Sequence, residues 1–145
     1  MICDLNSQIT NPKYKSRILL GLNMDQEELK QRTKEFAKRV IRLCQSLPKT
    51  FEAGAIGHQL FRSGTSVGAN YRSALRGRSK AEFISKLSIV VEEADESLYW
   101  MELLVETAMV ECHRLDPLMK ETSELVAIFV ATIKTLKGTG RLQVT

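Results

Sequence analysis

Residues 58–83, HQLFRSGTSVGANYRSALRGRSKAEF, carry the strongest structural signal in this chain. Gly64, Ser66, Gly68 and Ala69 fall inside what otherwise has the pattern of a single helix. Glycine inside a helix costs about 0.5–1 kcal/mol relative to alanine, so several small residues there predict a second backbone packed very close. Apolar residues at helical spacing lie beside this small-residue face: Ile56, Leu60, Val67, Tyr71 and Leu75.

The same segment is basic. No acidic residue lies between Ala53 and Ala81, whereas this interval holds Arg62, Arg72, Arg76, Arg78 and Lys80. Arg62, Arg72 and Arg76 fall within about 80° of one another at the helical repeat, which predicts one stripe of arginines. Such a stripe can contact phosphates or pair with acidic residues of a neighbouring helix, and the sequence leaves both alternatives open.

Signals at the end of this helix predict how the chain continues. We expect the helix to run from about Ala55 to Arg76, with Gly77 as its C′ residue. Ser79 can cap the next helix, with Glu82 three residues later completing a capping box. So short a connection makes the two helices antiparallel neighbours, and we expect the small-residue face to pack against this successor.

The next helix, expected from about Lys80 to Glu111, is apolar on two faces. One seam forms its core side: Phe83, Leu87, Val90, Val91, Ala94, Leu98, Met101, Val105 and Ala108. Ile89, Trp100 and Leu103 fall on nearly the opposite side. Apolar residues on two faces imply burial on both, so we predict that these three residues form an interface between subunits.

Two further helices complete the expected fold. The first begins near Asp25 and ends at Pro48, and the last begins at Asp116-Pro117 and ends at Gly138. The prediction is an all-α protein, an antiparallel up-down-up-down four-helix bundle over residues 25–138. Residues 1–24 and 139–145 are expected to be flexible tails.

The charge is distributed unevenly along the chain. Residues 1–80 hold 15 Lys and Arg against 6 Asp and Glu, and residues 81–145 hold 6 against 11, giving +9 and −5. This split permits a nucleic-acid or other polyanion partner, or basic and acidic faces that meet between subunits, and a solvated charge pattern with no partner is the simplest alternative. The candidate nucleic-acid-binding residues are Lys38, Arg39, Arg42, Arg62, Arg72, Arg76, Arg78 and Lys80.

Few residues suggest catalysis or a cofactor. Neither His58 nor His113 has the Glu three residues before it that a di-iron bundle requires, so we expect no metal and no cofactor. Glu92, Glu93 and Glu96 leave a Mg²⁺-dependent nucleotide hydrolase as the least favoured alternative. Pairing of these carboxylates with arginines is the simpler interpretation, and we expect no enzymatic activity.

Several features bear on location. Three cysteines without C-x-x-C spacing predict a reducing, cytoplasmic setting with no disulfide framework. No signal peptide is evident, and the longest apolar run, LVAIFVATI at 125–133, is far shorter than the ~20 residues of a membrane span. We therefore expect no membrane partner.

Leu60 to Leu104 resembles a known family of four-helix bundles, first met as proteins encoded in intervening sequences of bacterial 23S rRNA genes. Its hallmarks appear here as Arg62-Ser63, Ser66-Val67, Ala69-Asn70, Arg78-Ser79, Glu82-Phe83 and Leu98-Tyr99-Trp100. The similarity extends from about Glu28 to Leu136.

This resemblance implies a homo-oligomer, with a pentamer as the expected form, and it supplies no catalytic motif. A related group, the accessory variability determinant of diversity-generating retroelements, implies RNA or a reverse transcriptase as a partner. The resulting prediction is a non-enzymatic bundle that binds RNA or a ribonucleoprotein through its basic helices. The alternative is a protein-interaction scaffold with no nucleic-acid role.

Overall fold

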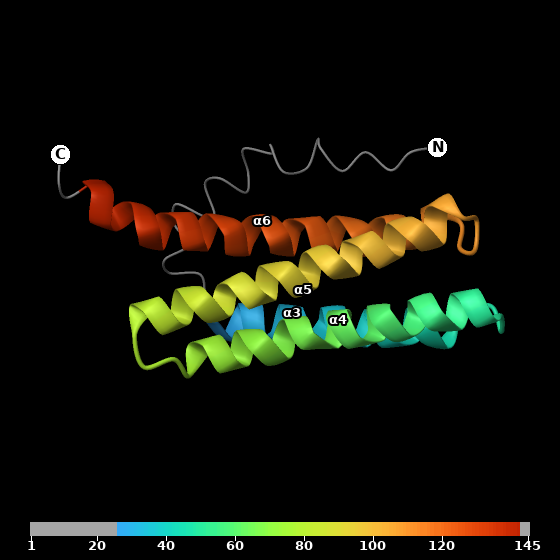
Figure 1. The fold of residues 1–145 in the computed structure, drawn as a ribbon, viewed down its shortest axis with the longest axis horizontal. Coiled ribbons are helices and arrows are strands. Elements are labelled where there is room, and N and C mark those ends of the chain that lie inside the picture. The colour runs from blue at the N-terminus through green and yellow to red at the C-terminus, as the bar shows by residue number, and fades with distance from the viewer. Residues whose placement is uncertain (1–25, 143–145) are drawn as a thin grey trace.

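The computed structural model describes residues 26–142, with side chains described through residue 138, and this part of the chain is a four-helix bundle. The helices are α3 (Gln26–Gln45), α4 (Phe51–Leu75), α5 (Lys80–Glu106) and α6 (Cys112–Leu142). Successive helices run in opposite directions, and no strand occurs in the described range (Figure 1). The predicted all-α bundle is confirmed. The predicted tail at residues 1–24 and the predicted helix start at Asp25 lie outside the described residues.

All four helices contribute to one core. The most deeply buried large side chains are Phe36 and Val40 from α3, Leu60 and Val67 from α4, Leu87, Val90, Met101 and Leu104 from α5, and Leu115, Leu125 and Phe129 from α6. The rings of Tyr71 and Phe129 meet at 5.3 Å between centroids and join α4 to α6. The apolar spacing in the sequence therefore identified the inward faces of α4 and α5. Ala108 is the exception, because this residue of the predicted core seam is exposed and lies beyond the end of α5.

The small-residue face of α4 packs against α3, which corrects the prediction that it packs against α5. A Cβ built on Gly64 would lie 2.8 Å from both methyl groups of Val40, and one on Gly68 would lie 3.2 Å from Thr33 Oγ1 and 3.4 Å from Thr33 O. The close approach was correctly predicted, but the partner is the preceding helix. Towards α5, α4 instead presents Ser63, whose hydroxyl accepts a hydrogen bond from Ser97 Oγ at 2.9 Å.

Side chains cap α4 and α5 at their first turns. The Ser79 hydroxyl accepts from the Glu82 amide at 3.1 Å, as the capping box predicts, and the Glu82 carboxylate accepts from the Arg78 amide. At the other end, the Thr50 hydroxyl accepts from the Ala53 amide at 3.2 Å. Thr50 therefore starts α4 at Phe51, four residues before the predicted start.

Both ends of the α5–α6 connection differ from prediction. Helix α5 ends at Glu106 rather than Glu111, and α6 begins at Cys112 with Pro117 inside it rather than at its first position. Leu115 is 1% exposed, so packing extends α6 upstream of its proline. At the other end, α6 continues past Gly138 to Leu142, because one glycine inside a helix costs only about 1 kcal/mol.

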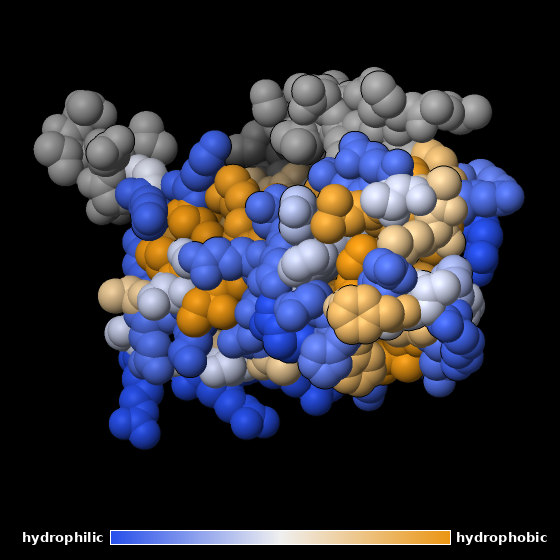
Figure 2. Space-filling view, turned by 45° about the vertical axis from the view of Figure 1, so that its right-hand side comes forward, coloured by the Kyte–Doolittle hydropathy of each residue, from blue (hydrophilic) through white to orange (hydrophobic). Residues whose placement is uncertain are grey.

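Helix α5 lies between α4 and α6 (Figure 1). It therefore needs apolar residues on two sides within a single copy, which accounts for part of its two-faced pattern. Trp100 is one residue of the second face that packs against the core of its own subunit. Figure 2 shows apolar side chains on the surface in short stretches separated by hydrophilic ones.

Cys44 and Cys112 lie in the described range. Cys44 is a free, half-buried thiol, and burial raises the pKa of this thiol. Cys112 is half-buried and is the first residue of α6. No helix in the described range is long and apolar enough to cross a membrane.

Candidate nucleic-acid interface

The four helices differ in charge more sharply than the two halves of the sequence do. Helix α3 has six basic and three acidic residues, and α4 has two and one. Helix α5 has two basic and seven acidic residues, whereas α6 has five and three. The negative charge assigned to the C-terminal half therefore belongs to α5 alone. Helices α3, α4 and α6 each carry a net positive charge, and the cations predicted to bind a polyanion lie on α3, on α4 and at the α4–α5 link.

Arg62 pairs with acidic residues of α5. Its guanidinium donates to the Glu93 carboxylate at 3.5 Å and to Glu96 at close range. The hydrogen bond from Arg62 is the main cause that lowers the pKa of Glu96. Between the two uses that the sequence left open for Arg62, the ion pair with the neighbouring helix is the one present in the structure.

Arg72 does not share the position of Arg62. Arg72 borders the seam between α3 and α4, with Lys30 and Lys34 across from it, whereas Arg62 reaches α5. Arg62 and Arg72 are about 80° apart around α4, and this angle is enough to place them on opposite flanks of the helix rather than in the one stripe that the sequence predicts. Arg72 and Arg76 are both exposed, and among the described residues neither makes an ion pair.

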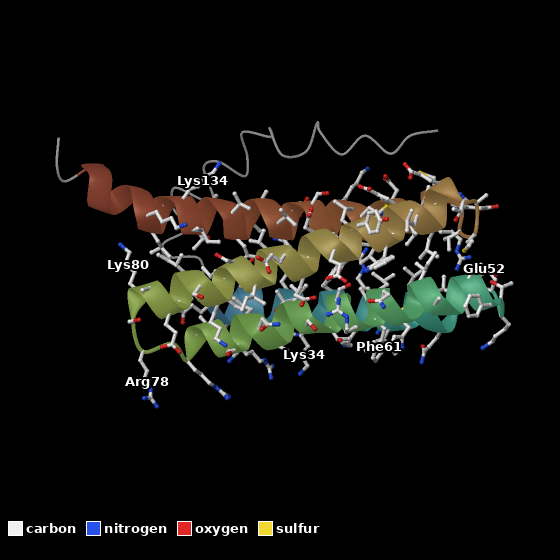
Figure 3. The ribbon with its side chains drawn as sticks, in the orientation of Figure 1. Lys34, Glu52, Phe61, Arg78, Lys80 and Lys134 are labelled. Atoms are coloured by element: carbon white, nitrogen blue, oxygen red, sulfur yellow. The ribbon has the colours of Figure 1, made fainter. Side chains whose placement is uncertain are left out.

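The other predicted cations form two groups along the bundle. Lys38, Arg39 and Arg42 lie on the second half of α3, where Lys38 pairs with Glu35 at 3.0 Å. Arg78 and Lys80 lie at the α4–α5 link, at the opposite end of the molecule from the α3–α4 link (Figure 3). The structure places all eight candidates at the surface or half-buried, but it does not gather them into one compact patch.

An ion-pair cluster that the sequence analysis missed joins α3 to α6. Arg32 Nε donates to Glu121 Oε1 at 2.9 Å, and its Nη2 also binds Glu124. The three side chains are only 19–22% exposed. Burial alone would lower the pKa of Arg32, but its contacts with Glu121 and Glu124 raise it. The spacing Glu121-x-x-Glu124 was visible in the sequence, whereas its distant partner was not.

The carboxylates considered for Mg²⁺ have other partners. Glu93 and Glu96 bind Arg62, and Glu96 also accepts from the Trp100 indole N–H at 3.2 Å. Glu92 is exposed on the same helix. Within residues 26–138, no three His, Cys, Asp or Glu side chains converge as metal ligands do. The arrangement is that of inter-helix ion pairs, as the simpler interpretation held.

The three residues predicted at a subunit interface are all half-buried in one copy. Trp100 packs partly against the core and stacks edge-on against Tyr99 at 5.0 Å between ring centroids. Ile89 and Leu103 are not among the half-buried residues that contact the core cluster. The Asn70 amide donates to Ser66 O in its own helix at 2.8 Å.

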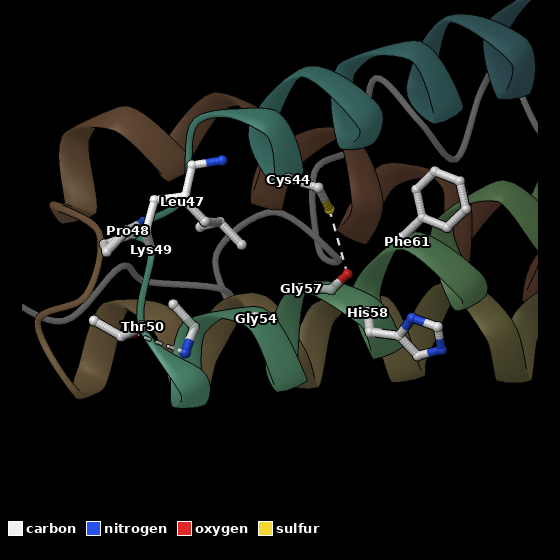
Figure 4. A pocket seen from close by; sticks show the side chains of 10 residues that line it. Cys44, Leu47, Pro48, Lys49, Thr50, Gly54, Gly57, His58 and Phe61 are labelled. Atoms are coloured by element: carbon white, nitrogen blue, oxygen red, sulfur yellow. Dashed lines mark hydrogen bonds between the residues drawn. The ribbon is translucent and has the colours of Figure 1, made fainter.

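A hollow of about 380 Å³ lies beside the α3–α4 link (Figure 4). Figure 4 shows Phe61 and His58 along one side and Leu47 and Pro48 along the other. The Cys44 thiol donates to Gly57 O at 3.4 Å within it. Its lining is mostly apolar and contains a single lysine, Lys49, so it is not a site for a polyanion.

Residues 25–131 match the family described as 23S rRNA-intervening sequence protein. Among solved structures, the chain is similar to a protein of unknown function from the S23 ribosomal protein family of Bacteroides thetaiotaomicron VPI-5482. The two share 34% sequence identity with a TM-score of 0.71, over 77% of this chain and 99% of the other. No curated protein matches the sequence.

Proposed function

The chain belongs to the 23S rRNA-intervening sequence protein family, and from this membership we propose that it is a non-enzymatic, homo-oligomeric bundle that binds RNA or a ribonucleoprotein. The binding surface comprises the exposed cations of α3, α4 and the α4–α5 link. The protein acts in the cytoplasm, where it would meet ribosomal RNA. RNA alone is the primary partner, and a reverse transcriptase bound to RNA is one form of the ribonucleoprotein.

One observation carries the proposal: the separation of charge between helices. Twenty-nine consecutive residues, from Ala53 to Ala81, contain no acidic side chain, and the negative charge is concentrated on α5. Arg72, Arg76 and Arg78 remain exposed, so their guanidinium groups are accessible to phosphate oxygens. Solvated cations of this kind contribute affinity through the release of counterions from RNA.

The test is a salt series with structured RNA. Wild-type protein should bind at low salt, with log K falling linearly as log salt concentration rises. The double variant Arg76→Gln/Arg78→Gln should bind more weakly, with a slope lower by roughly 0.7 to 0.9 for each lost phosphate contact. The control Lys134→Gln/Lys137→Gln removes the same charge from α6 and should leave the slope unchanged. Absence of binding at low salt, or affinity independent of salt, would refute the proposal.

A second candidate function is a protein-interaction scaffold whose arginines are used in ion pairs. Arg62 favours it, because this residue already pairs with Glu93 and Glu96. On this reading, Arg72→Glu should break the assembly, and solution scattering would show smaller particles. If Arg72→Glu weakens RNA binding while the particle size is unchanged, RNA binding is the better account.

A further inference from the structure

The seam between α3 and α4 contains a second hollow, of about 280 Å³, whose lining is basic. Lys30, Thr33, Lys34 and Ala37 line it from α3, and Thr65, Gly68, Ala69 and Arg72 line it from α4. Gly68 and Thr33 are in close contact in this seam, and the small side chains of Ala37 and Ala69 leave space beside that contact. We call these eight residues the α3–α4 groove.

The groove has cations on both walls and no acidic residue in its lining. Lys30 and Lys34 are one helical turn apart on α3, and Arg72 faces them from α4. Within residues 26–138, neither Lys34 nor Arg72 makes an ion pair. Lys30 pairs with Glu27 at 3.1 Å, but Glu27 is 76% exposed, and such surface pairs are worth less than about 1 kcal/mol.

The hydrogen-bond donors available in the groove are these cationic groups. The Thr33 hydroxyl donates to Leu29 O at 2.9 Å, and the Thr65 hydroxyl donates to Phe61 O at 2.7 Å. Both hydroxyl protons are therefore already used within their own helices. A ligand of the groove consequently needs several acceptor oxygens and a negative charge, and it needs no donor.

We propose that the α3–α4 groove seats a phosphate group of a bound RNA backbone, held by Lys34 and Arg72 with Lys30 at the rim. The inference rests on the proposed function and gives it a specific contact. Two of the residues in this contact, Lys30 and Lys34, are not among the eight candidate nucleic-acid-binding residues predicted from the sequence. A planar guanidinium can bind two phosphate oxygens at once. A hollow of about 280 Å³ has ample room for one phosphate group.

A steric variant tests the groove without changing charge. Ala69 is exposed on the groove wall, so Ala69→Leu adds three carbon atoms inside it while leaving the core intact. RNA affinity should fall about tenfold, the scale of one lost charge-assisted contact. Ala55→Leu is the matched control, because Ala55 is exposed on the same helix and lines neither hollow. Circular dichroism verifies that both variants fold.

A charge variant tests the two ligands. Lys34→Gln/Arg72→Gln should reduce the slope of log K against log salt by about 0.7 per contact with single-stranded RNA. Lys134→Gln/Lys137→Gln again serves as the control, since Lys34 and Lys134 lie on opposite edges of the bundle (Figure 3). If Ala69→Leu and Lys34→Gln/Arg72→Gln both bind RNA like wild type, the groove assignment is wrong even though the proposed function stands.

Titration of the full chain with inorganic phosphate, followed by amide NMR at constant ionic strength, separates the groove from RNA binding. Resonances of Thr65, Gly68 and Ala69 should shift in wild type and stay in place in Ala69→Leu. If they shift but wild type binds no RNA, the proposed function and the RNA assignment fail together, and the groove takes free phosphate compounds instead. Absence of any local shift would refute phosphate binding in the groove.

Competition with polyglutamate distinguishes RNA from an acidic protein. If polyglutamate competes as effectively as RNA, the groove binds an acidic protein and the inference is wrong.

Discussion

Ala108 adopts a backbone conformation that is unusual for its residue type. Its φ is 59°, in the left-handed region, although it is not glycine. It occupies the C′ position of α5, where the Ala108 amide donates to Val105 O and the Met109 amide donates to Leu104 O, both at 3.0 Å. This pair of bonds is a Schellman motif, in which C′ is usually glycine. The motif ends α5 at Glu106, five residues before the predicted end at Glu111.

We therefore expect Ala108→Gly to stabilise the protein. A left-handed backbone conformation costs an L-residue about 1–2 kcal/mol, and glycine removes this cost. Glycine also has more conformational freedom in the unfolded chain, which lowers the free energy of unfolding by about 0.4–1 kcal/mol and offsets part of the gain. The free energy of unfolding measured in urea should rise by about 0.5–1 kcal/mol. Ala55→Gly, an exposed position inside α4, should lower the same quantity by about 1 kcal/mol. Equal effects of both substitutions would contradict the strain at Ala108.

At the residue scale, local chemistry could be predicted and distant partners could not. Ser79 and Glu82 form the predicted cap because both partners lie within four residues of each other. The Arg32 cluster joins residues about 90 positions apart, and nothing in the spacing of Glu121 and Glu124 indicates which cation binds them. Arg62 likewise had two possible partners until the structure placed Glu93 and Glu96 beside it.

At the scale of the elements, the packing of α4 against α3 depends on the absence of a few side chains. Gly64 faces Val40, which is itself completely buried and has no room to move away. A methyl group there meets both Val40 methyls at 2.8 Å, so Gly64→Ala should destabilise the protein by about 1–3 kcal/mol, as overpacking does.

Two variants control for the loss of glycine itself. Gly54 has nothing within 4 Å of an added Cβ, so Gly54→Ala should stabilise the protein by up to about 1 kcal/mol through helix propensity. Val40→Ala in the Gly64→Ala background should restore part of the loss, which urea unfolding of all four proteins would measure. If Gly64→Ala and Gly54→Ala both stabilise, the close contact is not as tight as described.

Helix boundaries depend on the same tertiary contacts. The sequence contains the small residues and the inward apolar stripe of α4, but a close approach of two backbones has no signature that separates α3 from α5 as the partner. In the same way, Asp116-Pro117 has the pattern of a helix start, yet α6 begins upstream at Cys112, where burial of Leu115 extends it. Packing against distant residues overrides the local signal in both cases.

Charge concentrated on α5 predicts a pH dependence. Partial burial, together with the nearby carboxylates of Glu106 and Asp95, raises the pKa of Glu102. A raised pKa means that the folded state favours protonated Glu102, so stability is fully present below the ordinary Glu pKa of about 4.3 and is lost as pH rises through the folded pKa. Glu102→Gln should therefore raise Tm at pH 7, by roughly 1–3 °C because solvent screens the repulsion. At pH 3, where wild-type Glu102 is also neutral, the two melting temperatures should coincide. A gain that persists at pH 3 would mean that charge is not its cause.

At the scale of the whole molecule, one copy has a net charge of only +4 and one small groove with a few cations. A groove with only a few cations binds a single phosphate weakly. Repetition of the groove around a homo-oligomer would place several copies along one RNA, and linked sites of this kind can raise affinity by about 10²–10⁴ without any new contact. RNA binding and assembly are therefore connected in this proposal: an RNA that spans several grooves needs the oligomer.

The assembly surface can be tested at Leu103. This residue is half-buried on α5 but is not among those that contact the core cluster, so Leu103→Glu should leave the bundle folded while it disrupts an interface formed by Ile89, Trp100 and Leu103. Sedimentation should show an oligomer, with a pentamer expected, for wild type and single copies for Leu103→Glu. The control Phe51→Glu replaces a side chain that is 86% exposed at the first position of α4, on a different helix from the predicted interface, and it should leave the assembly intact. Because the groove is unchanged in the Leu103→Glu monomer, inorganic phosphate should still shift the resonances of Gly68 and Ala69. Affinity for a long RNA should fall about a hundredfold, the low end of what linked sites contribute. A wild-type protein that sediments as a single copy, or a monomeric variant that binds long RNA as tightly as wild type, would break the connection between assembly and binding.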